Sequence, residues 1–249
     1  MIRPLIKTAG IALIAVSLSG CVRLLPKAKE AQTYRFGGAS AAASGAGQVS
    51  AAGAFGVLKA PTGFVRAGAG DQLLTVLPGG QTAYIAQARW VSPAQVLFDE
   101  ALERRFDADP GPARLIARGD VGKAELVLKL DVRTFEAFYP DGPETVPTVR
   151  VEVRALITRN LDRGLVSDQL FTASVPASDN RVGAISAAFD KAVGEVLTQV
   201  VAAANAAAPA AAAAPAAIAQ PVAGAAPSPQ PTTPIAPPVE APPAAAPAN

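Results

Sequence analysis

Side chains that carry out acid–base or metal chemistry are scarce in this sequence. The 249 residues include no histidine and a single cysteine, which excludes histidine general bases, Ser-His-Asp triads, internal disulfides and Cys₄ zinc sites. The carboxylates Asp99, Glu100 and Glu103 fall on the polar side of an amphipathic segment, where they solubilise a helix. The glycines at 68–70 and 79–80 precede no Lys-Ser/Thr pair, so they form no phosphate loop. We therefore expect no catalytic residue, no metal and no cofactor.

The single cysteine, Cys21, stands where a modification would attach the chain to a membrane. Arg3 and Lys7 form a positive start, and an uncharged apolar run follows over 9–19. This run is too short for a membrane span, which takes about 20 residues, and has the length of a signal-peptide core. With Leu-Ser-Gly at 18–20, the cysteine resembles the lipobox of bacterial lipoproteins, in which the thiol is acylated, palmitate included, and the chain is cleaved before it. The alternative is an ordinary secretory signal with an incidental cysteine.

Composition divides the rest of the chain. We predict a lipoprotein signal peptide at 1–20, a lipidated tether with a Gly/Ala/Ser-rich loop at 21–53, a folded domain at 54–204, and a disordered Ala/Pro-rich tail at 205–249. A first short strand at 34–36 can also belong to the domain.

The residue after the cysteine and the charge balance bear on location and partners. Val22 stands where an aspartate often retains enteric lipoproteins in the inner membrane, so the outer membrane, facing the periplasm, is favoured. Without the signal peptide, which holds Arg3 and Lys7, the basic side chains equal the 20 acidic ones. This balance gives no footprint for nucleic acid.

Alternation of apolar and charged residues with a period of two predicts the sheet. The predicted strands are 55–58, 73–77, 81–90, 124–132, 149–157 and, more weakly, 165–175. Turn residues at 78–80 and 160–164 join neighbouring strands into hairpins. Strands with one wet face are typical of antiparallel sheets.

Two segments repeat apolar residues at helical spacing. The first starts at Ser92 as N-cap, with Pro93 as the first helical residue, and ends at Asp109. The second spans 180–204, with Ser178 or Asp179 as its cap. The sum is an α+β fold, a mostly antiparallel sheet with two amphipathic helices packed on one face.

Aromatic residues supply the remaining candidates. The strand ending in Arg89-Trp90 leads through Pro93 into the first helix, so Trp90 is expected to pack between helix and sheet, while Arg89 caps or pairs locally. A second group, Phe135, Phe138 and Tyr139, ends a strand. It is a candidate contact for a partner or a lipid, and the alternative is the edge of the core.

The run YIAQARWVSPAQVLFDEALERRF, residues 84–106, resembles the ABC-type transport auxiliary lipoproteins. The matching residues are Tyr84, Arg89, Trp90, Pro93, Ala101, Leu102 and Glu103. The start of the chain, the strand ending in Phe135-Glu136 and the last amphipathic helix are similar too. The Gly/Ala insertion at 37–53 and the Ala/Pro tail depart from the pattern.

This resemblance implies a non-enzymatic lipoprotein at the outer-membrane end of a lipid transport system. Its implied partners are a periplasmic MCE-domain protein, an ABC permease and its ATPase, which supplies the energy. The resemblance carries over one functional residue, Cys21 as the lipidation site. A competing hypothesis is a structural or regulatory envelope lipoprotein that threads peptidoglycan with its Pro-rich tail and contacts cell-wall enzymes.

Overall fold

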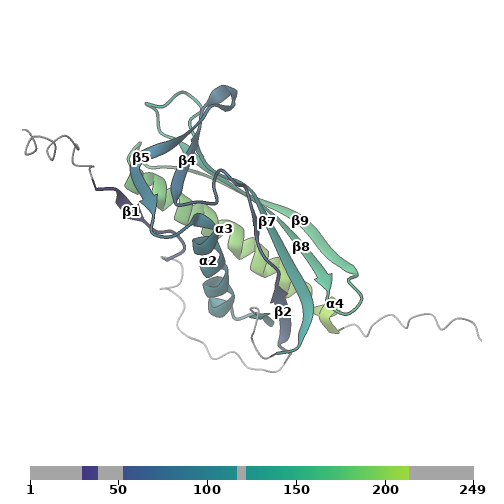
Figure 1. Ribbon diagram of the computed structural model, residues 1–249. Helices are drawn as coiled ribbons and strands as arrows, with labels where there is room; N and C mark the ends of the chain where they lie inside the picture. Colours follow the sequence, from purple (N-terminus) through teal and green to yellow (C-terminus); the bar gives the residue numbers. More distant parts are fainter. Residues whose placement is uncertain (1–29, 39–52, 117–121, 213–249) are drawn as a thin grey trace, which may run out of the picture. The chain divides into compact units, whose positions relative to one another are not determined.

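The computed structural model describes residues 30–38, 53–116 and 122–212, and every structural statement below concerns these (Figure 1). The predicted signal peptide, Cys21, the loop from 39 to 52 and the tail beyond 212 lie outside them. Within the described part, no helix combines the length and the hydropathy that a membrane span requires.

The described residues form one nine-stranded sheet and two long helices. The strands are β1 (Gln32–Tyr34), β2 (Phe55–Lys59), β3 (Gly63–Phe64), β4 (Gln72–Val76), β5 (Thr82–Trp90), β6 (Ala113–Ile116), β7 (Ala124–Phe138), β8 (Thr148–Arg159) and β9 (Leu165–Pro176). The helices are α2 (Ala94–Ala108), α3 (Val182–Ala206) and the short α4 (Ala208–Ala212), with a 3₁₀ turn, η2, at Pro78–Gly80. The α+β class is confirmed.

The long strand β7 organises the sheet. On one edge it pairs antiparallel with β8, which pairs antiparallel with β9, as the predicted hairpin at 160–164 requires. Along its other edge run β2, β3 and β4 in succession, all parallel to it. β6 adds to β2 in parallel, β5 adds to β4 through the predicted hairpin at 78–80, and β1 adds to β5 in parallel.

The expectation of a mostly antiparallel sheet is wrong, because five of the eight strand pairings are parallel. Hairpins reveal themselves in sequence, since a turn joins consecutive strands. A parallel pairing joins segments far apart in the chain and leaves no turn between them. The short strands β3 and β6 were not anticipated for the same reason.

A bulge in β7 shifts its buried face by one residue. Leu130 and Val132 are buried, and the register against β8 then shifts between Val132 and Thr134. Phe135 and Ala137 are the next buried residues. Without the bulge, the period of two would place Phe135 on the opposite face of the sheet.

The starts of both helices differ from the predicted caps. Pro93 occupies the N-cap position of α2, and no side chain caps it. Instead, the N–H groups of Ala94 and Gln95 donate to the carbonyls of Gly70 and Ala69, at 2.8 and 3.3 Å. A neighbouring loop thus satisfies the free donors of the first turn.

The second long helix begins after Arg181, and the side chain of Asp179, two residues earlier, accepts a hydrogen bond from the Arg181 N–H. At its other end α3 continues to Ala206, and Ala208–Ala212 form α4. The chain is therefore helical for several residues beyond the predicted start of the tail. Alanine has the highest helix propensity, and Pro209 lies in the first turn of α4, where proline is tolerated.

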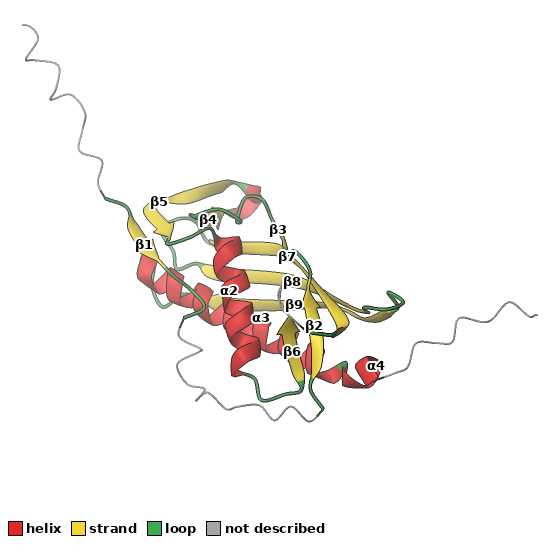
Figure 2. Ribbon diagram, turned by 60° about the horizontal axis from the view of Figure 1, so that its bottom comes forward, coloured by secondary structure: helices red, strands yellow, loops and turns green. Residues whose placement is uncertain are grey.

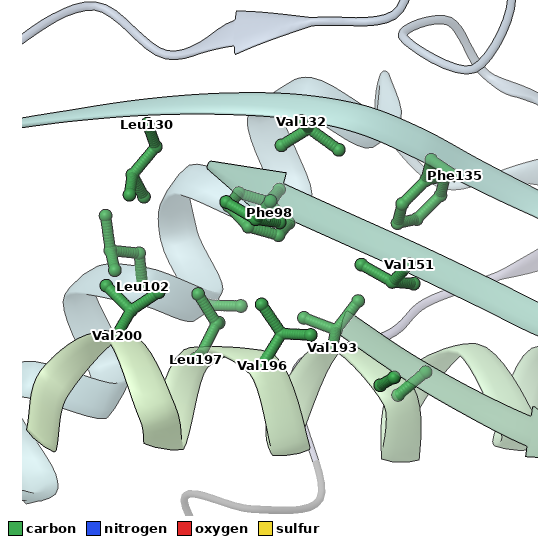
Figure 3. Close-up of a cluster of buried hydrophobic side chains, with 14 of the residues drawn as sticks. Phe98, Leu102, Leu130, Val132, Phe135, Val151, Val193, Val196, Leu197 and Val200 are labelled. Atoms are coloured by element: carbon green, nitrogen blue, oxygen red, sulfur yellow. The ribbon is translucent and has the colours of Figure 1, made fainter. Parts of the chain in front are cut away.

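The core lies between the sheet and the two long helices, which share one face of the sheet (Figure 2). Figure 3 shows side chains of β7 and β8 pointing toward α3, with two residues of α2 in the same layer. Its labelled members are Phe98, Leu102, Leu130, Val132, Phe135, Val151, Val193, Val196, Leu197 and Val200, all at most 2 % exposed.

Candidate functional site: the dock of the N-terminal segment

Trp90 is the centre of a cluster of aromatic rings. Its side chain is 2 % exposed, and its ring meets Phe36 and Phe189 edge to face, at 4.9 and 5.2 Å between centroids. Phe135 contacts the same two phenylalanines at 5.3 and 4.8 Å. Such geometry adds about 0.5–1.5 kcal/mol per pair to the burial itself. Trp90 thus packs between helix α3 and the sheet, as expected from the sequence.

Phe36 brings the N-terminal segment, residues 30–38, into this cluster. Its side chain is fully buried. The pattern of Tyr34-Arg35-Phe36 predicts a short strand before a Gly/Ala run and does not predict this role of Phe36. The strand itself, β1, covers 32–34. A single large aromatic before a glycine pair was the available signal.

The residue after Phe36 is clamped between the two long helices. The Gly37 N–H donates to Asp190 Oδ1 of α3 at 2.5 Å, and the Gly37 carbonyl accepts from Arg104 Nε of α2 at 3.1 Å. Gly37 has φ +75°, and a Cβ there would lie 2.5 Å from the Cβ of Ala101. Both facts require glycine at this position.

The strand before Phe36 pairs with the end of β5. Gln32 to Tyr34 lie beside Ala88 to Trp90 in parallel, and the Val91 N–H continues the ladder to the Tyr34 carbonyl at 2.8 Å. Arg35 extends to Glu100 of α2, with 2.6 Å between Nη2 and Oε2. Strand pairing, ring burial and the glycine clamp together fix the segment to the domain. We call this arrangement the N-terminal dock.

The other members of the Arg89-Trp90-Pro93 motif have local roles. Arg89 forms an ion pair with Asp71, at 2.7 Å between Nη1 and Oδ2, and both side chains are exposed. Pro93 ends the loop before α2 and its carbonyl accepts the Leu97 N–H at 3.1 Å. The motif therefore places Trp90 in contact with Phe36 of the N-terminal segment, and α2 begins directly after it at Ala94.

The three aromatics at the end of β7 do not form one surface. Phe135 and Tyr139 belong to the core face, and Tyr139 Oη donates to Asn180 Oδ1 at 3.0 Å. Burial raises the pKa of the Tyr139 phenol. Phe138 points to the opposite face, where the guanidinium of Arg150 lies 3.8 Å from its ring centroid. Phe135 and Phe138 lie on opposite faces because they are three residues apart in one strand, and partner or lipid contact stays a prediction, for which Phe138 is the partly exposed candidate.

A small cavity adjoins the dock between α2 and α3. Its volume is about 20 Å³, and Gly37, Ala101, Arg104, Val193 and Leu197 are among its lining residues. Arg104 Nη2 is buried there without a hydrogen-bond partner among the described residues. This volume fits about one water molecule, and the cavity cannot hold an acyl chain.

Charged side chains of the outer strands β8 and β9 and of their turn form ion pairs that are partly exposed to solvent. Arg154 binds Asp168 and Arg159 binds Asp162 on the outer strands. The hydrogen bond from Arg159 holds the pKa of Asp162 at about 2, and that from Arg154 lowers the pKa of Asp168. Among the described residues, no group of three acidic or cysteine side chains could hold a metal ion.

One of the solved structures that the chain resembles supports a shared fold. Protein XCC0632 from Xanthomonas campestris superposes with a TM-score of 0.54 and 23 % identity, over 63 % of this chain and 85 % of that one. Hypothetical protein CT253 from Chlamydia trachomatis has a TM-score of 0.42 and 12 % identity, over 60 % and 94 %. A putative lipoprotein from Caulobacter crescentus has a TM-score of 0.35 and 18 % identity, over 54 % and 89 %.

No curated protein sequence matches the chain. The sequence model of one family matches residues 67–201, which run from the loop before β4 to the last turns of α3 and include Trp90 with its partners Phe135 and Phe189. That segment is more than half of the chain and carries the motif on which the resemblance rests. The chain belongs to the family of ABC-type transport auxiliary lipoprotein components.

Proposed function

We propose that this protein is a non-catalytic lipoprotein of the outer membrane, facing the periplasm, that serves an ABC/MCE-type system moving lipids or other hydrophobic molecules between the two membranes. The family supports the auxiliary role in ABC-type transport. The observation that carries the anchored role is the N-terminal dock, because it joins the predicted tether rigidly to the folded domain.

The length of the tether sets how far the domain can lie from the membrane. An acyl group on Cys21 would stand ten residues before Ala31, which directly precedes β1. Ten extended residues reach at most about 36 Å. Because the dock removes any further slack up to Gly37, the domain stays next to the membrane that holds the anchor.

A multiply acylated cysteine makes this anchor stable. Each buried CH₂ contributes about 0.8 kcal/mol, and more than one chain is needed for lasting attachment. The domain then acts as a fixed receptor at the membrane surface. An MCE-domain protein would dock on it, and the ATPase of the same system would supply the energy at the other membrane.

Phe138 is the contact that we retain for this partner. Its ring lies on the sheet face opposite the helices and beneath Arg150, whose guanidinium also binds Glu136. Aromatic and arginine side chains are enriched where interfaces derive most of their energy. The ring and the ion pair are already ordered, so a partner would not have to immobilise them.

In-cell crosslinking of the tagged full-length protein, followed by capture from membranes and mass spectrometry, tests the proposal. Recovery of an MCE-domain protein with its permease and ATPase is expected, and Phe138→Ala should weaken it. Leu161→Ala is the matched control, because Leu161 is 75 % exposed in the β8–β9 turn and has no predicted role. Recovery of cell-wall synthases alone would contradict the transport proposal and support the peptidoglycan alternative.

A further inference from the structure

The hairpin of β4 and β5 carries no charge from Gln72 to Ala88. Asp71 and Arg89 are the charged residues nearest to it on either side, and none occurs between them. These two pair with each other at the base of the hairpin, 2.7 Å apart. We call the segment between them, residues 72–88, the uncharged arm. It holds no charged side chain, and the Asp71–Arg89 ion pair neutralises the charges at its base.

The outer part of the arm is exposed to solvent. All residues of the turn η2 are exposed, and so are Thr82, Ala83 and Ala86 of β5. Tyr84 is 44 % exposed, although its hydroxyl donates to the Ala67 carbonyl at 3.1 Å. Transfer of this surface out of water desolvates no charged side chain, so the large free-energy cost of burying a charge does not arise.

The other connections between long strands differ in this respect. The β8–β9 turn contains Asp162 and Arg163, and the β7–β8 connection contains Asp141 and Glu144. Charged groups there resist transfer into an apolar environment. The absence of charge is thus particular to the uncharged arm among these connections.

The arm lies close to the point where the tether enters the domain. β1 begins with Gln32 beside Ala88, at the inner end of the arm. Figure 1 shows β1 next to β5, with the β4–β5 hairpin extending beyond it. Since the tether reaches at most about 36 Å from Cys21, the arm is within range of the same membrane.

We propose that the tip of the uncharged arm, residues 77–84, rests in the headgroup region of the membrane to which the protein is anchored. Tyr84 suits this position, because tyrosine places an apolar ring and a polar hydroxyl at a membrane–water interface. The arm is a second contact beside the acyl anchor and sets the orientation of the domain. This inference rests on the proposed acylation of Cys21.

Site-directed spin labelling of the acylated full-length protein tests the inference. Cys21 is the chain's single cysteine, and acylation blocks its sulfur, so an introduced cysteine is the one reactive thiol. Gln81→Cys places the label at the tip, and Leu161→Cys is the matched control at the opposite end of the sheet. The vesicles contain phosphatidylethanolamine and phosphatidylglycerol.

On vesicles, the label at 81 should lose access to a water-soluble nickel reagent and gain access to oxygen, within about 5–10 Å of the headgroup–acyl boundary. The label at 161 should remain in water. Adding Ala83→Glu and Ala86→Glu to Gln81→Cys should return that label to water, with circular dichroism confirming the fold. Shielding that persists in the glutamate variant would overturn the inference.

The remaining outcomes separate the inference from the proposed function. Vesicle-bound protein whose label at 81 stays as accessible as that at 161 overturns the inference and leaves the anchor intact. Shielding that occurs only after an MCE-domain protein is added also overturns it and assigns the arm to protein contact. Acylated protein that fails to sediment with vesicles overturns the proposed anchor, and the inference with it.

Discussion

Replacing Phe36 with alanine tests whether the N-terminal segment is part of the folded core. The ring is fully buried and contacts the rings of Trp90 and Phe135, at 4.9 and 5.3 Å. Truncating such a phenylalanine costs about 3–5 kcal/mol, which includes the cavity that it leaves. Total stability of a domain is about 5–15 kcal/mol, so this loss is a large fraction of it.

The size of the effect can be followed by thermal and chemical unfolding. For a domain of 150–250 residues, each kcal/mol lowers Tm by about 2–4 °C, so we expect Phe36→Ala to lower Tm by about 6–20 °C. Hydrogen exchange localises the change, because the Val91 N–H donates to the Tyr34 carbonyl and is protected while β1 is docked. That amide should exchange faster in the variant, together with Gly37.

Phe138→Ala is the control, since this ring is partly exposed on the other face of the sheet and contacts Arg150. A loss of about 1 kcal/mol is expected there, with no change at Val91. If Phe36→Ala unfolds within about 1 kcal/mol of the unchanged chain, or if the Val91 amide exchanges at the same rate, then the N-terminal dock does not hold the tether and the reasoning fails.

Three further predictions concern the rest of the fold. Gly56→Ala should lower the free energy of unfolding measured in urea by about 1–3 kcal/mol, because a Cβ there would meet the backbone of β7 and of the residue before it. Asn205→Ala should cost about 1–3 kcal/mol, because the Asn205 side chain ties the end of α3 to the start of β6: its oxygen accepts the Ala113 N–H at 3.0 Å and its amide nitrogen donates to Asp109 at 2.8 Å. Asn205→Asp should not recover this loss, because it places a second carboxylate beside Asp109. The pKa of Asp162 is held at about 2 by its hydrogen bond from Arg159, against an unfolded value of 3.8. The ionised Asp162 therefore stabilises the fold above pH 3.8, and this contribution is lost as the pH falls through 2. Across that window, the free energy of unfolding in urea should decrease less for Asp162→Asn than for the unchanged protein. A variant with the same pH profile as the unchanged protein would contradict the assignment.

The long amphipathic elements were predictable because their patterns are local. The alternation in β7 and β8 and the stripes on the two long helices each identify a buried face without reference to any other part of the chain. The hairpin turns at 160–164 and 78–80 then predicted the pairs β8–β9 and β4–β5. Trp90 was expected in the interface between helix and sheet for the same local reason, since it ends a strand and precedes a helix.

Features that depend on distant segments were not predictable. The parallel pairing of β2, β3 and β4 with β7 is set by tertiary contacts, and so is the capping of α2 by the carbonyls of Gly70 and Ala69. The bulge at Arg133 shifts the buried face by one residue, so that Phe135 and Tyr139 lie in the core and Phe138 lies on the opposite face. The dock was missed because Phe36 stands beside a Gly/Ala run that has no pattern of its own.

The bend in β5 explains how one strand serves both the dock and the uncharged arm. Gln87 has φ +59°, and the pairing with β4 skips from Gln72–Arg89 to Leu74–Tyr84 at this point. β5 thus carries extra residues that turn its outer half away from the direction of Ala88 to Trp90. Had β5 stayed straight, the register Gln32–Ala88 would place Ala31 beside Gln87 and Glu30 beside Ala86, and the tether would be bound along the strand. Instead, Glu30 and Ala31 are exposed and unpaired. The bend ends the pairing at Gln32, which leaves Glu30 and Ala31 unpaired where the predicted tether enters the domain, and it leaves the outer part of the uncharged arm exposed.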